Sequence, residues 1–234
     1  MPSFHEFYGS NRGGGLFSEA VSQRLGAATA LAGSRLGLRP TTLTLANLVI
    51  GLAVSVTVVA RASTWSAWVG VLALVGWQIA YVLDCSDGQL ARVTGQRSPA
   101  GARIDILCDV ASQIALVTAL SAVAVARSDA PVWLTAAFAG TWMVNLVTSA
   151  LQSGPNAASM VPSRSLPVRV VKLVRDPGAV FATAGLVLAF APGLAIWYVA
   201  AFTVINGGFL LASIAFTARA AYRDPAQASS PDPA

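Results

Sequence analysis

Six stretches of the chain are almost wholly apolar, and most of them are long enough to cross a membrane. An α-helix needs about 20 apolar residues to span the hydrocarbon core of a bilayer. Backbone polar groups must be hydrogen-bonded within the protein there, which favours helices. We therefore predict an all-α integral membrane protein with six transmembrane helices, preceded by a juxtamembrane amphipathic helix. The predicted spans are Thr41–Ala60, Trp65–Leu83, Gly101–Ala126, Val132–Leu151, Gly178–Ala191 and Leu194–Thr217.

The composition agrees with this class. Hydrophobic residues make up 55% of the chain and charged residues 11%, whereas roughly a quarter of a typical soluble domain is charged. The net charge of +5 does not indicate a nucleic-acid partner, because the arginines flank apolar segments, where they contact anionic headgroups and phosphates. The two cysteines, Cys85 and Cys108, are too few for a disulfide framework. We expect them to be reduced thiols on the cytosolic side.

The regions outside the spans divide the chain further. Residues 1–15 lack the pattern of a cleaved signal peptide, and we expect a flexible cytosolic start. Residues 16–39 predict an amphipathic helix that lies on the bilayer or, alternatively, packs only against protein. Residues 40–218 form the predicted six-helix domain, and residues 219–234 form a tail predicted to be disordered. The apolar positions that recur with a near-helical period are Phe17, Val21, Leu25, Ala28, Leu31, Ala32 and Leu36.

The cationic residues predict an orientation for this layout. With the amino terminus in the cytosol, only Arg61 and Arg127 lie outside. Cytosolic loops carry an excess of Lys and Arg, so we predict a multi-pass protein of the cell (inner or cytoplasmic) membrane with both termini in the cytosol. The thirteen cationic residues that would lie inside are Arg12, Arg24, Arg35, Arg39, Arg92, Arg97, Arg103, Arg164, Arg169, Lys172, Arg175, Arg219 and Arg223.

Four of the ten acidic residues lie between positions 84 and 109, at the ends of apolar segments. Carboxylates are costly in such places, which makes them a default functional hypothesis. Asp84 and Asp87 are three residues apart, and Asp105 and Asp109 are four apart. Each pair therefore shares one helix face if its segment is helical. The short turn between the segments would bring the four carboxylates together at the cytosolic surface, where their repulsion calls for hard cations such as Mg²⁺ or Mn²⁺.

Small and basic residues beside the aspartates fit a ligand that carries phosphate. Gly88 removes a side chain next to Asp87 and lets a ligand approach the backbone, and Gly101 does the same at the start of the third span. Ala91 permits close helix packing. Arg92 offers a planar fork of donors that suits a phosphate or a carboxylate.

In order, the run is Asp84-Cys85-Ser86-Asp87-Gly88-Gln89-Leu90-Ala91-Arg92, eight residues, Gly101, three residues, Asp105, three residues and Asp109. This run resembles the signature of the CDP-alcohol phosphotransferase (CDP-alcohol phosphatidyltransferase) family, and every fixed position of that pattern is filled. The six-span layout with a preceding amphipathic helix is also similar to the family's.

The resemblance implies a metal-dependent transferase of phospholipid biosynthesis. Members transfer a phosphatidyl or other substituted phosphate group from a CDP-linked donor to an alcohol and release CMP. For this chain it favours CDP-diacylglycerol as the donor and a small alcohol or alcohol phosphate as the acceptor. It also implies contact with membrane lipid and a homodimer.

The roles that the resemblance implies can be assigned residue by residue. Asp84, Asp87 and Asp105 would hold a pair of Mg²⁺ or Mn²⁺ ions. Asp109 would also approach the metals and act as the general base. The residues implied for the CDP site are Gly88, Ala91, Arg92 and Gly101.

Other interpretations stay open on the sequence alone. A soluble CDP-alcohol could be the donor with a lipid as the acceptor. Prenyl-diphosphate enzymes also present aspartate pairs to magnesium, and a cation or proton carrier also uses buried carboxylates. The aspartates could instead cap helix ends with Arg92, Arg97 and Arg103, or form a zinc site with Cys85 and Cys108, for which soft ligands are few.

The loop before the fifth predicted span is a further candidate for substrate recognition. Its cations could recognise the phosphate of a phosphorylated alcohol, or could simply contact lipid headgroups. They are Arg164, Arg169, Lys172 and Arg175.

Overall fold

The computed structural model describes residues 2–11, 15–151 and 176–223, and within these ranges the chain forms helices and no strand. The predicted all-α class is confirmed. The elements are α1 (Phe4–Gly9), a π-helical turn η1 (Ser18–Ser22), α2 (Gln23–Arg35), α3 (Pro40–Arg61), α4 (Ala67–Val93), α5 (Pro99–Ser128), α6 (Val132–Leu151), α8 (Pro177–Phe190), a 3₁₀ turn η2 (Pro192–Leu194) and α9 (Ala195–Arg223).

Four helical stretches are long and apolar enough to cross a membrane, and they confirm the membrane class. They are Pro40–Arg61, Ala67–Val93, Pro99–Ser128 and Pro192–Ala215. Two shorter apolar stretches, Val132–Val144 and Pro177–Phe190, fall in the predicted fourth and fifth spans. The count of six spans and the division of the chain into domains stay predictions.

Helix α4 continues well past Leu83, where the second predicted span ended. It runs to Val93 and is followed by Gly95 at a φ of 70°, a left-handed position that favours glycine after a helix. Burial explains the extension, because Gln89 is fully buried and donates from Nε2 to the carbonyl of Gln23 at 3.0 Å. The first two aspartates of the signature therefore lie inside a helix and share one of its faces.

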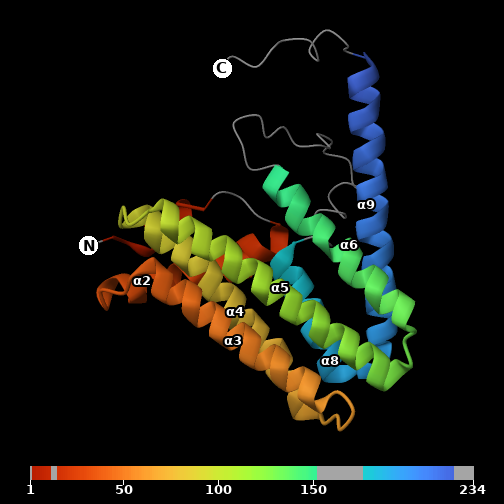
Figure 1. Ribbon diagram of the computed structural model, residues 1–234. Helices are drawn as coiled ribbons and strands as arrows, with labels where there is room; N and C mark the ends of the chain where they lie inside the picture. The colour runs from red at the N-terminus through yellow and green to blue at the C-terminus, as the bar shows by residue number, and fades with distance from the viewer. Residues whose placement is uncertain (1, 12–14, 152–175, 224–234) are drawn as a thin grey trace.

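Helices α2, α3 and α8 gather around α4 (Figure 1). α4 packs against α2, α3 and α8, and α3 also packs against α5. α6 packs against α9, and both of these helices contact α5. The interior is apolar and includes the large side chains Trp77 and Phe138, which are 2% and 0% exposed. The acidic segments of α4 and α5 thus lie in a group of packed helices that also includes α3 and α8.

The amino-terminal segment differs from the prediction of a flexible start. Residues 4–9 form α1, because Ser3 and Glu6 make a reciprocal capping box at its first turn. Phe7 is fully buried in a cluster that also holds Leu90 of α4. Local capping and one buried aromatic ring therefore hold this part of residues 1–15 against the bundle.

Helix α2 lies within residues 16–39, for which the sequence predicts an amphipathic helix. It turns Gly26 and Ala30 inward, and a Cβ on Gly26 would lie 3.0 Å from the Cβ of Cys85 in α4. Leu25 and Leu36 are 53% and 75% exposed. The outward apolar side chains suit a helix that lies on a bilayer, a position that stays a prediction.

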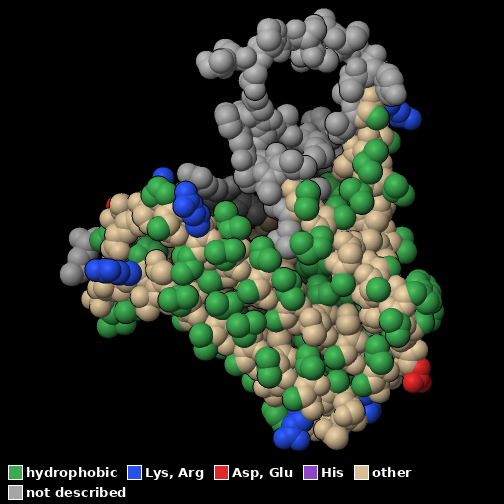
Figure 2. Space-filling model, viewed as in Figure 1, with side chains coloured by type: hydrophobic (Ala, Val, Ile, Leu, Met, Phe, Trp, Pro, Cys, Tyr) green, Lys and Arg blue, Asp and Glu red, His purple; other side chains and the backbone are tan. Residues whose placement is uncertain are grey.

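Apolar side chains also cover the outer surface of the bundle. Figure 2 shows hydrophobic side chains spread over the visible face, with Lys and Arg gathered near its ends. Val49 and Val56 of α3 and Leu107 of α5 are each more than half exposed. Apolar surface on this scale needs an apolar surrounding, which a bilayer supplies.

Two glycines let α4 and α8 approach each other closely. A Cβ on Gly70 would overlap the carbonyl oxygen of Leu188 and the Cα of Ala189, and a Cβ on Gly185 would lie 2.5 Å from the Cα of Leu74. Backbone atoms cannot swing aside as a side chain can. Small residues at these two positions are therefore a condition of the α4–α8 contact.

Gly70→Ala should destabilise the detergent-solubilised protein, because overpacking of this kind costs roughly 1–3 kcal/mol. Gly140→Ala in α6 is the matched control, since no atom lies within 4 Å of a Cβ built there. The melting temperature of each variant is measured from the monodisperse fraction that remains after heating to a series of temperatures. Equal melting temperatures for the two would contradict the close α4–α8 contact.

Candidate active site

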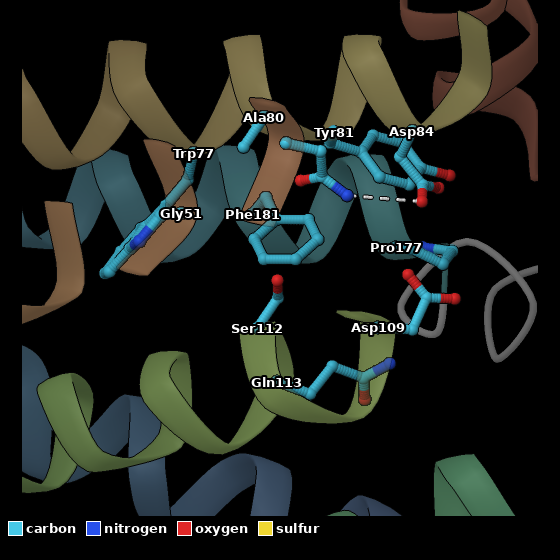
Figure 3. Close-up of a pocket in the computed structure, with 11 residues that line it drawn as sticks. Gly51, Trp77, Ala80, Tyr81, Asp84, Asp109, Ser112, Gln113, Pro177 and Phe181 are labelled. Carbon is cyan, nitrogen blue, oxygen red and sulfur yellow. Dashed lines mark hydrogen bonds between the residues drawn. The ribbon is translucent and has the colours of Figure 1, made fainter. Parts of the chain in front are cut away.

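The four aspartates lie on two helices that are bridged by α3. Asp84 and Asp87 belong to α4, and Asp105 and Asp109 belong to α5. α3 packs against both helices. In Figure 3, Asp84 comes from one helix and Asp109 from the other, and both border the same cavity.

Three of the four carboxylates form a tight cluster. One oxygen each from Asp84, Asp105 and Asp109 all lie within 4.8 Å of one another. Two negative charges at this separation repel by roughly 3.5 kcal/mol at an effective dielectric constant of about 20. If all three carboxyl groups were ionised, their mutual repulsion would be comparable with the whole stability of an ordinary domain. A retained proton or a bound cation relieves this repulsion, and hard carboxylate oxygens fit a divalent cation such as Mg²⁺ or Mn²⁺.

Asp87 lies outside this cluster of three and has a different environment. Its side chain is 5% exposed. The hydroxyl of Thr44 in α3 donates to its Oδ2 at 2.5 Å, which fixes the orientation of the carboxylate. Metal binding by Asp87 stays a prediction, as do the roles of the other signature residues.

Helix α3 supplies two polar contacts that the sequence reasoning missed. Besides the bond from Thr44 to Asp87, Asn47 Nδ2 lies 3.4 Å from Asp84 Oδ1 and donates to it. Thr44 and Asn47 are 3% and 4% exposed, and their three-residue spacing puts them on one face of the helix. Polar residues in an otherwise apolar span were the available signal, because such residues usually face the protein interior.

The small and basic signature residues lie on the same two helices. The guanidinium of Arg92 covers Gly88, since a Cβ there would lie 2.9 Å from its Nη1. Arg92 also interacts electrostatically with Asp105. Gly101 is in the first turn of α5, where its N–H donates to the Ser98 hydroxyl at 3.0 Å. Gly88 thus makes room for Arg92, a role that the sequence alone did not suggest.

A cavity of about 190 Å³ opens beside the cluster. Figure 3 shows Trp77, Tyr81 and Phe181 on one side of it, with Ser112 and Gln113 on the facing helix. α3, α4, α5 and α8 all contribute to its wall. The lining residues are Asn47, Gly51, Trp77, Ala80, Tyr81, Asp84, Asp109, Ser112, Gln113, Pro177 and Phe181.

A buried hydrogen-bond network fixes the part of the wall that α8 forms. Asp176, 2% exposed, caps α8 by accepting from the N–H of Gly178 at 3.0 Å. It also accepts from the backbone N–H of Ser18 at 2.9 Å and from the Ser18 hydroxyl. The Tyr81 hydroxyl lies 2.9 Å from that of Ser18 and must be the donor, because Ser18 has one hydroxyl proton. The ring of Tyr81 contacts that of Phe181, with centroids 5.5 Å apart.

Two further sequence hypotheses concern the loop cations as a substrate-recognition site and the two cysteines as zinc ligands. The loop cations Arg164, Arg169, Lys172 and Arg175 lie outside the described residues. Cys85 and Cys108 are free thiols. Within the described part of the chain, the metal-ligating side chains that gather in a group are aspartates.

Comparison with known proteins gives a family-level match. The family model for CDP-alcohol phosphatidyltransferase matches residues 38–218, which include α3, the acidic cluster and the cavity-lining part of α8. A search of curated proteins finds no match.

Thr44→Val should weaken binding of Mn²⁺ by the purified protein, because Asp87 would lose the hydroxyl that orients it. Loss of a partner that orients a metal ligand typically costs 10–100-fold in affinity. Thr44→Ser keeps the hydroxyl and should bind Mn²⁺ like the wild type. Calorimetric titration in detergent measures the affinities, and equal affinities for the Val and Ser variants would count against a role for this contact.

Proposed function

Because this chain belongs to the CDP-alcohol phosphatidyltransferase family, we propose that it transfers a phosphatidyl group from CDP-diacylglycerol to a small alcohol or alcohol phosphate and releases CMP. The observation that carries the proposal is the cluster of Asp84, Asp105 and Asp109 at the edge of a cavity. Divalent ions held by these carboxylates would also bind the negatively charged diphosphate of a CDP-linked substrate.

The metal site in this proposal is built from the aspartates of both helices. Asp84, Asp105 and Asp109 would hold Mg²⁺ or Mn²⁺, with Asp87 as a further ligand. When bound, the ions neutralise negative charge on the diphosphate and on the leaving CMP. Family members generally use divalent metals, and the close carboxylate oxygens support the same requirement here.

The CDP part of the donor is assigned to the signature residues beyond the aspartates. Arg92 would bind phosphate through its planar fork of donors. Gly88 supports this role, because the space above it admits the Arg92 guanidinium. Ala91 and Gly101 complete the proposed nucleotide site, since neither carries a side chain that would block close approach.

Asp109 is the proposed general base. Its carboxylate belongs both to the acidic cluster and to the cavity wall, so it can reach a hydroxyl group in the cavity. In the proposed step the acceptor oxygen bonds to the phosphorus of the phosphatidyl group, the bond from that phosphorus to the bridging oxygen breaks, and CMP leaves with the electron pair. Asp109 accepts the hydroxyl proton.

The setting of the reaction follows from the charge distribution. We place the protein in the inner or cytoplasmic membrane with six spans, both termini in the cytosol and the site at the cytosolic face. The excess of cationic residues in the predicted inside segments supports this orientation. The resemblance to the family supports a homodimer and a role in phospholipid biosynthesis.

Purified protein with CDP-diacylglycerol, Mg²⁺ and a panel of alcohols and alcohol phosphates should release CMP and form a new phospholipid. Removal of divalent ions with EDTA should abolish the release, and added Mg²⁺ should restore it. A second arm with soluble CDP-alcohols and diacylglycerol tests the reverse assignment of the lipid. Absence of CMP release in both arms would overturn the proposed function.

Asp109→Asn should lower CMP release at least 100-fold, because a positioned general base contributes about 10²–10⁴-fold. Binding of the CDP-linked donor, measured by calorimetry, should remain detectable. Asp129→Asn is the matched control, since Asp129 is an exposed residue at the other end of α5 and asparagine tolerates its left-handed backbone. Full turnover by Asp109→Asn would contradict the assignment of Asp109 as the general base.

A further inference from the structure

We propose that the cavity beside Asp109 is the acceptor site and that it selects an uncharged polyol over a phosphorylated alcohol. This inference rests on the proposed function and narrows its acceptor class. It is carried by the position of the cavity relative to the signature, by the charge of its wall and by polar atoms in that wall.

The cavity and the proposed nucleotide residues lie on opposite sides of the carboxylates. In α4, Trp77 comes seven residues before Asp84 and Arg92 eight residues after it, which separates the two by about 22 Å along a helix that rises about 1.5 Å per residue. In α5, Gly101 precedes the aspartates, whereas Ser112 follows them. Since Trp77 and Ser112 line the cavity, both helices place the cavity away from the nucleotide side.

A cavity and a nucleotide site on opposite sides of the carboxylates suit a reaction in which one oxygen displaces another at phosphorus. The attacking and leaving oxygens of such a reaction are roughly in line on opposite sides of the phosphorus. CMP would leave toward Arg92 and Gly101, so the acceptor hydroxyl has to come from the other side. The cavity is on that side, and Asp109 lies at its border with the cluster.

The charge of the cavity wall disfavours a phosphorylated acceptor. Its described lining contains two carboxylates, Asp84 and Asp109, and includes no Lys, Arg or His. In the proposed function divalent ions occupy these two carboxylates, so a phosphate deeper in the cavity would face the other lining residues. Among the described ones it would find no side-chain cation, although an anion in a protein site is normally paired with basic groups or backbone N–H donors. A neutral hydroxyl compound carries no such penalty.

Polar atoms in the wall suit a compound with several hydroxyl groups. The Oγ of Ser112 is buried, and no hydrogen-bond partner for it occurs among the described residues. Gln113 Oε1 accepts from Trp142 Nε1 at 3.0 Å, and because an indole can only donate, the NH₂ of Gln113 is left as a donor. Asn47 donates to Asp84 and keeps its carbonyl oxygen as an acceptor.

The size and the remaining wall also fit a small polyol. A dry cavity of about 150 Å³ is enough to bind benzene, so about 190 Å³ accommodates a molecule with a six-membered ring or a short chain. Trp77 donates its Nε1 to Ser55 at 3.1 Å, away from the acceptor, and so offers ring surface to the cavity. The rings of Trp77 and Phe181 can cover the C–H faces of a polyol, while its hydroxyls meet the polar atoms of α3 and α5.

The first test compares matched acceptors on the purified full-length protein with CDP-diacylglycerol and Mg²⁺. The pairs are glycerol with glycerol 3-phosphate and myo-inositol with myo-inositol 1-phosphate. At least one neutral member should give lipid product with a kcat/KM ten or more times that of its phosphorylated partner. Product from phosphorylated members alone would overturn the inference and leave the proposed function intact, whereas no CMP with any acceptor or donor would overturn both.

The second test changes the cavity wall. Ser112→Ala removes the unpartnered hydroxyl, and Gly51→Ala adds a methyl group that would lie 3.6 Å from Ser112 Oγ and 3.9 Å from Ala80 Cβ, so neither variant forces a clash. Each should raise the KM for the neutral polyol about tenfold and leave the KM for CDP-diacylglycerol unchanged. Thr118→Ala, which removes an exposed hydroxyl from the same helix, should change neither constant. Unchanged polyol KM in both wall variants would contradict the assignment of the cavity.

Discussion

Mutual repulsion among Asp84, Asp105 and Asp109 is the constraint on which the site depends. Their oxygens lie within 4.8 Å of one another inside a protein whose outer surface is apolar, so the arrangement requires either a shared proton or a bound cation. Helices can hold charges against such repulsion, because each aspartate is fixed by the packing of a whole element. The packing of α3 against α4 and against α5 is therefore what keeps the acidic segments together.

Helix α3 has three functions in this arrangement. Along its length it packs against α4 and α5, and near the cluster its polar residues Thr44 and Asn47 contact Asp87 and Asp84. One turn further, Gly51 lines the cavity between the same two helices. The same helix therefore sets the distance between the acidic segments, orients two of their carboxylates and leaves room for a ligand.

Local sequence patterns predicted the features that depend on neighbouring residues alone, namely the apolar helices and the shared face of each aspartate pair. Apolar length indicated the spans, and the spacing of the aspartates indicated one shared face in each pair. Contacts between distant segments could not be predicted in this way. Ser18 and Asp176 are 158 residues apart, and no periodicity relates them. The apolar residues indicated a span that ends at Leu83, whereas helix α4 continues through Asp87 to Val93 with Gln89 buried against α2.

The bond between Ser18 and Asp176 shows that the unit that builds the site is larger than the unit that defines the family. The family match begins at residue 38, yet Ser18 holds the hydroxyl of Tyr81 in the cavity wall and helps to cap α8. The segment around η1 is a structural part of the cavity, although no signature residue lies in it. A change in the segment before the first span can therefore alter the shape of this wall without any change in the signature.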